Sequence, residues 1–150
     1  MSSVSPKKRA EDPRIGALLR VPTQAIHRRI IAGLNRAGFD DLRLPHVAVL
    51  QNPGPDGYRP SELAERAGMS KQAMNQLLHS LEQLGYLTRR DTPADGRARI
   101  VHFTARGWAM QAKLYELLAD IEAEWRAVLG DAHFDQLQAL LCEVWESELV

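Results

Sequence analysis

Residues 61–90, with the sequence SELAERAGMSKQAMNQLLHSLEQLGYLTRR, decide how this chain folds. Ala64, Gly68 and Met74 stand four and then six residues apart in this stretch. That spacing is typical of a helix-turn-helix, in which a small residue lets two helices approach, a glycine makes the turn, and an apolar residue anchors the second helix. A second helix held in this way can enter the major groove of DNA.

The second helix is predicted from Lys71 to about Leu84, with Ser70 as its N-cap and Gly85 as its stop. One of its faces is apolar, and the opposite face carries amide, hydroxyl and lysine side chains with no acid before Glu82. Amide side chains can hydrogen-bond the edges of bases, and lysine and serine can reach guanine or phosphate. We therefore expect DNA contacts from this face, namely from Ser70, Lys71, Gln72, Asn75 and Gln76.

Residues 86–90 and 99–103 alternate like two short antiparallel strands, and the intervening DTPADGRA (91–98) supplies turn residues. An arginine at the tip of such a hairpin can enter a narrow minor groove, where the negative potential is strong. We expect Asp95 to orient Arg97 for this purpose. The hairpin residues predicted to contact DNA are Arg89, Arg90, Asp95, Arg97 and Arg99. The alternative is an ordinary Asp-Gly turn with solvated arginines.

The flanking sequence predicts further helices and so a mainly α (α+β) fold. A first helix begins at Asp12-Pro13, is kinked or restarted at Pro22, and ends near Gly38. Shorter helices are expected at about residues 45–51 and 60–67, separated by the turn-rich NPGPDG (52–57). A long helix at about 105–129, capped by Thr104, and a last helix that includes Phe134 and Trp145 complete the chain.

Composition sets limits on what the chain can be. Its 150 residues suffice for one domain, and 45% hydrophobic with 25% charged residues is ordinary for a soluble protein. No apolar run approaches the roughly 20 residues that span a bilayer, and MSSVSPKKRAEDP lacks the apolar centre of a signal peptide, so a cytoplasmic location is expected. The single cysteine, Cys142, rules out an internal disulfide and a cysteine-built zinc site.

The formal net charge is zero, but the charges are unevenly distributed. Residues 1–58 carry nine Lys/Arg against five Asp/Glu, and residues 59–106 carry eight against five. Residues 107–150 carry two against nine. A basic middle joined to an acidic C-terminal third fits a protein with one face toward phosphates, so net neutrality does not argue against a DNA partner.

The order of elements, with residues 61–90 followed by DTPADGRARIVHFTARG (91–107), resembles the MarR family of winged helix-turn-helix transcriptional regulators. The resemblance runs from about Pro13 to Leu149, and its most specific parts are the Asp-x-Arg of residues 95–97 and the Thr-x-x-Gly of residues 104–107. It implies a homodimer whose two lobes bind a pseudo-palindromic operator in double-stranded DNA. It also implies a small-molecule pocket beside each lobe and, from family habit, a repressor that this ligand releases.

The resemblance implies a helical dimerisation region at residues 12–42 and 107–150 and the winged helix-turn-helix lobe at 43–106. Residues 1–11 are polar and basic and are expected to form a flexible arm. The pocket would take a small aromatic or anionic effector and be lined by His27, Arg28, His46, Leu50, Trp108 and Tyr115. The chain departs from the family pattern at Pro22 and in the missing Ser or Thr caps at Arg43-Leu44-Pro45 and Arg59-Pro60.

Other functions find less support in the residues. No nucleophile and base, phosphate loop or metal motif indicates an enzyme, and no cofactor is expected. A winged helix used for protein contacts would carry an apolar or acidic recognition face. The five histidines have no metal-ligand spacing, and Cys142 is predicted to be a buried, inert thiol on the apolar side of the last helix. A metal- or redox-sensing regulator of the same fold is the other alternative.

Overall fold

The structure, a computed structural model, describes residues 13–51, 57–91 and 99–148, with the side chains of Asp91 and Arg99 left out. Its elements are α1 (Ile15–Arg36), α2 (Leu44–Leu50), α3 (Pro60–Arg66), α4 (Lys71–Gln83), β1 (Leu87–Asp91), β2 (Arg99–Phe103), α5 (Ala105–Leu129) and α6 (Asp131–Glu146). The strands pair antiparallel, with Arg89 opposite Val101. This mainly helical fold with one small sheet confirms the predicted fold class. Among the described helices, none combines the length and apolarity needed to cross a membrane.

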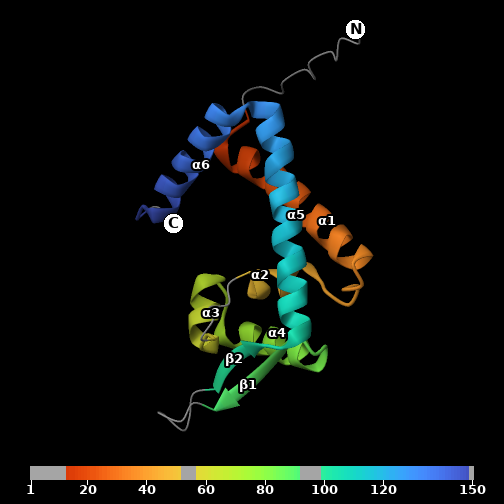
Figure 1. Cartoon of the computed structure of the whole chain (residues 1–150). Coiled ribbons are helices and arrows are strands. Elements are labelled where there is room, and N and C mark those ends of the chain that lie inside the picture. Colours follow the sequence, from red (N-terminus) through yellow and green to blue (C-terminus); the bar gives the residue numbers. More distant parts are fainter. Residues whose placement is uncertain (1–12, 52–56, 92–98, 149–150) are drawn as a thin grey trace.

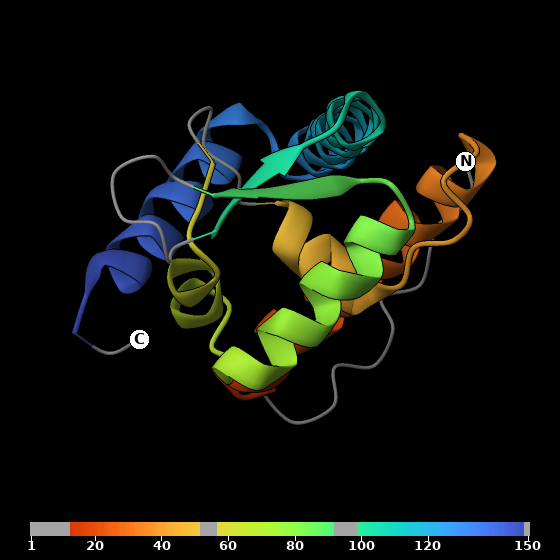
Figure 2. The same cartoon turned by 90° about the horizontal axis from the view of Figure 1, so that it is seen from below.

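The helices are arranged around α5, which runs from the sheet to the start of α6 (Figure 1). At one end of α5 lie α2, α3, α4 and the β1–β2 hairpin, and at the other end α6 turns back at an angle. α1 packs along α5. Seen from the hairpin end, α4 lies across the face of the molecule beside the two strands (Figure 2). The predicted DNA-reading helix is therefore on a surface remote from α6.

One hydrophobic core holds the elements of the hairpin end together. Met74, Leu78 and Leu81 of α4 are fully buried, as the predicted apolar face requires. They pack in a cluster with residues of the other elements, including Ile30, Leu34, Leu50, Tyr86, Met110 and Leu114. Burial of each large side chain of this kind contributes about 1.5–3 kcal/mol, so α4 is a firmly held surface element.

The Thr104-x-x-Gly107 sequence joins the sheet to α5. Thr104 Oγ1 accepts from the Gly107 N–H at 3.1 Å, which caps α5, and donates to the Gly85 carbonyl at 2.5 Å. A Cβ on Gly107 would collide with the carbonyl oxygen of Tyr86. Only glycine therefore fits at residue 107, because the chain leaving α4 passes directly against the first turn of α5.

Of the kink or restart predicted for the first helix at Pro22, the restart is wrong. α1 continues from Ile15 to Arg36 with Pro22 inside it. A proline removes one N–H from the helix and disturbs the turn before it. Here that turn contains Leu18 and Leu19, which are exposed. The second half of the helix is held by core contacts of Ile30 and Leu34, so the helix is not ended by one local defect.

The two helices without a Ser or Thr N-cap, α2 and α3, are capped by side chains of their own first turns. His46 Nδ1 accepts from the Arg43 N–H at 3.1 Å at the start of α2. Glu62 Oε2 accepts from the Arg59 N–H at 3.2 Å at the start of α3. Each acceptor stands three residues after the N–H that it satisfies, as in one half of a capping box. The departures from the family pattern therefore leave both helix starts intact.

Asp41, in the loop after α1, is bonded to both ends of the α4–α5 junction. Tyr86 Oη donates to Asp41 Oδ1 at 2.5 Å, and Arg106 donates to Asp41 Oδ2 at 2.8 Å. The Arg106 guanidinium also lies 4.3 Å from the centroid of the Tyr86 ring and bonds the Leu84 carbonyl. Burial and the hydrogen bond to Asp41 raise the pKa of Tyr86, so its hydroxyl stays a donor.

Candidate nucleic-acid interface

The helix-turn-helix is built as the spacing of Ala64, Gly68 and Met74 predicts. Ala64 and Met74 are buried, with 2% and 0% of their surface exposed. Gly68 has φ of +61°, a conformation that a glycine adopts without the strain other residues incur. Ser70 Oγ accepts from the Ala73 N–H at 3.1 Å and caps α4. These contacts fix the direction of α4 relative to α3.

The outward face of α4 carries the five residues predicted to contact DNA. Ser70, Lys71, Gln72, Asn75 and Gln76 are all exposed. His79, one turn after Asn75, is also exposed, and its ring Nε2 lies 3.1 Å from Gln83 Nε2. The structure thus brings donors, acceptors and a cation together on a single exposed surface, which we call the α4 face (Ser70, Lys71, Gln72, Asn75, Gln76).

Arg89, which the sequence predicts to contact DNA, is paired with an acid of α4. Its side chain is 17% exposed and forms an ion pair with Glu82 of α4, with 2.6 Å between Nη2 and Oε2. Its Nε donates to the same oxygen at 2.7 Å, and its backbone N–H donates to Oε1 at 3.1 Å. Its Nη1 donates to Asn75 Oδ1 at 3.4 Å. Arg89 is therefore held against α4 by one acid and in contact with one member of the α4 face.

Glu82 is the residue of this site that the sequence reasoning missed. The hydrogen bonds from Arg89 hold the pKa of Glu82 below its usual value, so the carboxylate is charged at neutral pH. Glu82 is the first acid of α4, and it precedes Arg89 by seven residues. That separation crosses the turn at Gly85, so no helical spacing rule reveals the pair.

The other hairpin residues are only partly described. Arg90 is exposed in β1, on the opposite side of the strand from Arg89. Arg99 begins β2, opposite Asp91, but its side chain lies outside the described structure. Asp95 and Arg97 also lie outside the described residues, so their predicted contact with the minor groove stays a prediction.

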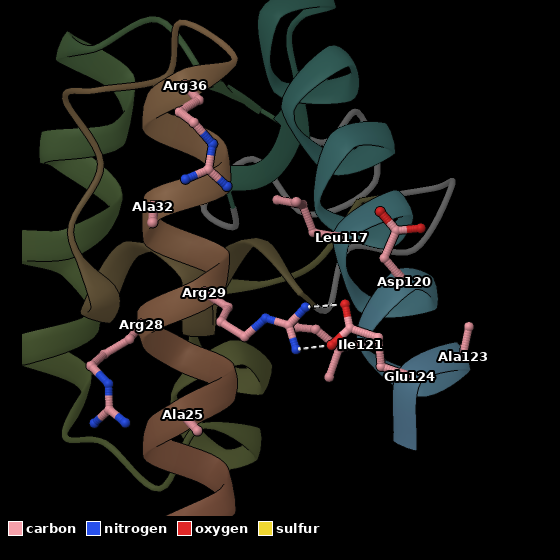
Figure 3. A pocket seen from close by; sticks show the side chains of 10 residues that line it. All are labelled: Ala25, Arg28, Arg29, Ala32, Arg36, Leu117, Asp120, Ile121, Ala123 and Glu124. Carbon is pink, nitrogen blue, oxygen red and sulfur yellow. Dashed lines mark hydrogen bonds and ion pairs between the residues drawn. The ribbon is translucent and has the colours of Figure 1, made fainter. Parts of the chain in front are cut away.

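Of the six predicted pocket residues, His27 and Arg28 of α1 line one pocket of about 750 Å³ with residues of the loop after α1 and of α2. Arg28 also lines a second pocket of about 670 Å³ between α1 and α5, shown in Figure 3. There Arg29 points across to α5 and bonds both carboxylate oxygens of Glu124 at 2.8 and 2.6 Å, which lowers the pKa of Glu124. Arg28 points away from α5, to the other flank of α1.

The other four predicted pocket residues lie elsewhere. Leu50 is fully buried in the core, and His46 is 4% exposed, with its Nε2 3.2 Å from Ser80 Oγ of α4. Burial lowers the pKa of His46, so the ring is neutral at pH 7. Trp108 is 45% exposed and packs edge-on against Phe103, with 4.9 Å between ring centroids, and Tyr115 is 51% exposed. None of these four lines the pocket that His27 and Arg28 share, and a ligand in contact with all six stays a prediction.

The prediction that Cys142 is buried is wrong for the described chain. Cys142 is exposed, because α6 packs mainly on α5 and leaves much of its apolar side uncovered. A groove of about 280 Å³ between α1, α5 and α6 is lined by Cys142, Trp125 and Trp145 among others. Within residues 13–51, 57–91 and 99–148, no three His, Cys, Asp or Glu side chains stand close enough to share a metal ion.

Comparisons with known proteins agree on one family. The model of the MarR family matches residues 47–98, which contain α3, α4 and the start of the hairpin. The HTH-type transcriptional repressor Rv2887 of Mycobacterium tuberculosis is 33% identical over 105 residues, which are 67% of this chain and 71% of that protein. A crystal structure of Rv2887 in complex with salicylic acid aligns with a TM-score of 0.64 and 28% identity over 89% of this chain and 98% of the other.

A second solved structure has the same fold. The transcriptional repressor CouR, bound to a 23-mer DNA duplex, aligns with a TM-score of 0.72 and 22% identity over 95% of this chain and 100% of the other. The helix-turn-helix, the hairpin and the flanking helices α1, α5 and α6 are thus shared with solved regulators. Together with the relative at 33% identity, they show that this chain belongs to the MarR family of transcriptional regulators.

Proposed function

We propose that this chain is a homodimeric repressor that binds a pseudo-palindromic operator and is released by a small anionic ligand. The observation that carries the DNA-binding part is the α4 face, in which every member is exposed on a helix that the core holds firmly. Base edges are read by such amides, and lysine supplies a phosphate contact. CouR, of the same fold, was solved on duplex DNA, which supports the same use of this surface.

The homodimer is supported by apolar side chains that the single chain leaves exposed. On α6, Leu140, Val144 and Trp145 are 52%, 47% and 83% exposed. On α1, Ile15, Leu18 and Val21 are also exposed. The start of α1 lies at the end of the molecule where α6 lies (Figure 1). A large apolar surface of this kind marks a protein interface. A second copy would cover it and place two α4 helices for successive major grooves, about 34 Å apart.

The corner between α5 and α6 is held by its own contacts, which fixes the direction of this apolar surface. Arg126 forms ion pairs with Asp135 at 2.7 Å and with Asp131 at 3.4 Å. Its guanidinium also lies 4.3 Å from the centroid of the Phe134 ring. A defined angle between the two helices is what a defined dimer would need.

Arg28 supports the choice of an anionic ligand. It lines the pocket beside α2 together with His27, and this pocket lies where α1 meets the helix-turn-helix lobe. Rv2887 was crystallised with salicylic acid, a small aromatic carboxylate. We infer that a ligand of this class binds beside Arg28 and favours a spacing of the two lobes that no longer fits the operator.

A selection from random duplexes tests the DNA-binding part. The full chain should enrich two inverted half-sites whose centres lie about 10 base pairs apart. Failure to enrich any sequence would overturn the function, and enrichment of a single half-site would overturn the paired arrangement.

Light scattering during size-exclusion chromatography tests the dimer. The chain should elute with twice the mass of one copy, and Trp145→Glu should reduce this to one copy because it places a charge in the apolar surface. Gln72→Glu adds the same charge on the α4 face and should leave the mass unchanged. A monomeric parent chain, or a dimeric Trp145→Glu variant, would contradict the proposed interface.

Calorimetric titration with salicylate tests the ligand site. Arg28→Gln should weaken binding at least about tenfold, the scale of a charge-assisted hydrogen bond. Arg36→Gln is the matched control, because Arg36 stands on the same helix but lines only the pocket between α1 and α5. Because Arg28 lines both pockets, loss of binding in Arg36→Gln, whether or not Arg28→Gln also loses it, would place the ligand in that second pocket instead.

A further inference from the structure

Arg89 connects two side chains of α4 although it belongs to β1. Glu82 and Asn75 stand seven residues apart, which is about two helical turns, so they lie on the same side of α4. The guanidinium of Arg89 is anchored on Glu82 through Nε and Nη2, at 2.7 and 2.6 Å. Its Nη1 reaches Asn75 Oδ1 at 3.4 Å. An anchored cation thus contacts an exposed amide of the α4 face.

The charge of Arg89 is already matched by Glu82. The two side chains are only 17% and 26% exposed, and the Arg89 backbone N–H also donates to Glu82. A phosphate contact would have to compete with this close ion pair. The geometry is therefore better suited to holding Asn75 than to binding the DNA backbone.

We propose that Arg89 sets a base preference of α4 by holding the Asn75 amide with Oδ1 toward the protein and Nδ2 toward DNA. The proposal rests on the proposed function of the α4 face in DNA reading. Asn75 is exposed, and both orientations of its amide would otherwise be open to it in water. The contact with Arg89 selects the orientation that places the two N–H donors outward.

An outward NH₂ group recognises acceptors in the major groove. Both purines offer N7, guanine adds O6, and thymine offers O4, whereas cytosine presents only its N4 donor. Asn75 held in this way therefore discriminates against cytosine at the base that it faces. Without Arg89 the amide can turn over, and its oxygen can then accept from cytosine.

Arg89→Lys separates this role from a merely structural one. Lysine keeps the positive charge beside Glu82, so the hairpin keeps its ion pair, but one ammonium group cannot serve both Glu82 and Asn75 in the geometry of the guanidinium fork. Fluorescence anisotropy would measure binding to the selected operator and to every single-base substitution of it. Arg89→Lys should reduce discrimination against cytosine at one position of each half-site by about five- to tenfold, with the other positions unchanged.

A double-substitution cycle shows whether the effect passes through Asn75. In an Asn75→Ala background, Arg89→Lys should change no base preference, because the amide that it positions is gone. An unchanged preference in Arg89→Lys alone would overturn the proposal. So would an equal change with and without Asn75, since Arg89 would then act on DNA directly.

Glu82→Gln gives a second approach that does not alter Arg89. It weakens the anchor of the guanidinium and should reduce discrimination at the same position, by less than Arg89→Lys does. A change at a different position, or none, would count against the proposal. Parent protein that enriches no sequence would refute DNA reading by α4 itself, which is a different result from an operator whose base preferences ignore Arg89.

Discussion

Tyr86→Phe removes one hydroxyl from the junction of the first loop, α4 and α5. The ring is fully buried and would keep its packing, so the change isolates the hydrogen bond of 2.5 Å to Asp41. A hydrogen bond to a charged group contributes about 1.5–3 kcal/mol. The Asp41 side chain is 27% exposed and keeps Arg106 at 2.8 Å, so water can replace part of the loss. We therefore expect the free energy of unfolding to fall by about 1.5–2 kcal/mol.

The cost of Tyr86→Phe should depend on pH. Burial acts to raise the pKa of Asp41, but the hydrogen bonds from Tyr86 and Arg106 outweigh it and hold the pKa below its usual value. A carboxyl with a lowered pKa in the folded state stabilises the fold fully above its unfolded pKa of about 3.9. That stabilisation is lost as the pH falls through the folded pKa. The difference between parent and variant should therefore be largest near pH 7 and shrink below about pH 4.

Urea unfolding at one fixed protein concentration would measure the difference, because association shifts apparent stability. Tyr58→Phe is the matched control. The Tyr58 hydroxyl accepts from the exposed Arg66 at 3.1 Å, so its removal should cost less than about 0.5 kcal/mol. Equal costs for the two variants would refute the reasoning, as would a Tyr86→Phe cost that is the same at pH 7 and pH 3.5.

Three further experiments, with five substitutions, test other parts of the structure. Gly107→Ala should lower the free energy of unfolding by about 2 kcal/mol or more, because its Cβ would meet the Tyr86 carbonyl. Gly16→Ala, whose Cβ would have nothing within 4 Å, should instead stabilise α1 by up to about 1 kcal/mol. A Gly107→Ala variant with a higher melting temperature than Gly16→Ala would contradict this packing. Burial lowers the pKa of His46, so the free energy of unfolding should fall as the pH drops below about 6.5. His46→Gln should remove this part of the pH dependence, measured by urea unfolding between about pH 5 and 7.5. A variant that keeps the parent's pH dependence would exclude His46 as its source. In anisotropy titrations, Lys71→Ala should weaken binding to operator and to random DNA alike, and should reduce the slope of log affinity against log salt concentration by about 0.9. Gln76→Ala should weaken binding to the operator alone. Equal losses of affinity for both DNAs in Gln76→Ala would argue against a base contact.

Local features of the lobe could be predicted from the sequence because each leaves a short-range pattern. The apolar spacing of α4, the Ser70 cap and the turn at Gly68 lie within a few residues of what they determine. The same holds for Thr104 and Gly107, whose contact with each other is local although its packing against Tyr86 is not. Spacing in the sequence is enough where the interaction is within one or two helical turns.

Features that depend on a partner distant in sequence could not be predicted. The sequence predicts only a DNA contact for Arg89, because nothing in it shows that Glu82 lies beside Arg89 across the turn at Gly85. His46 is predicted to line the ligand pocket. In the structure it caps α2, and its ring lies against Ser80, which is 34 residues away in the sequence. Asp41 and Tyr86 are 45 residues apart, and no spacing rule joins them. Burial and pairing are properties of the folded chain, and single residue types do not record them.

The 25 residues of α5 form an uninterrupted helix between the hairpin and α6. At 1.5 Å per residue this helix is roughly 37 Å long. A small rotation at one of its ends therefore produces a large displacement at the other. A tilt of about 5° near α6 displaces the far end by roughly 3 Å, close to the rise of one base pair, about 3.4 Å. A small rotation of α5 at the proposed dimer surface would therefore move the α4 face by about one base step, because the length of α5 amplifies it.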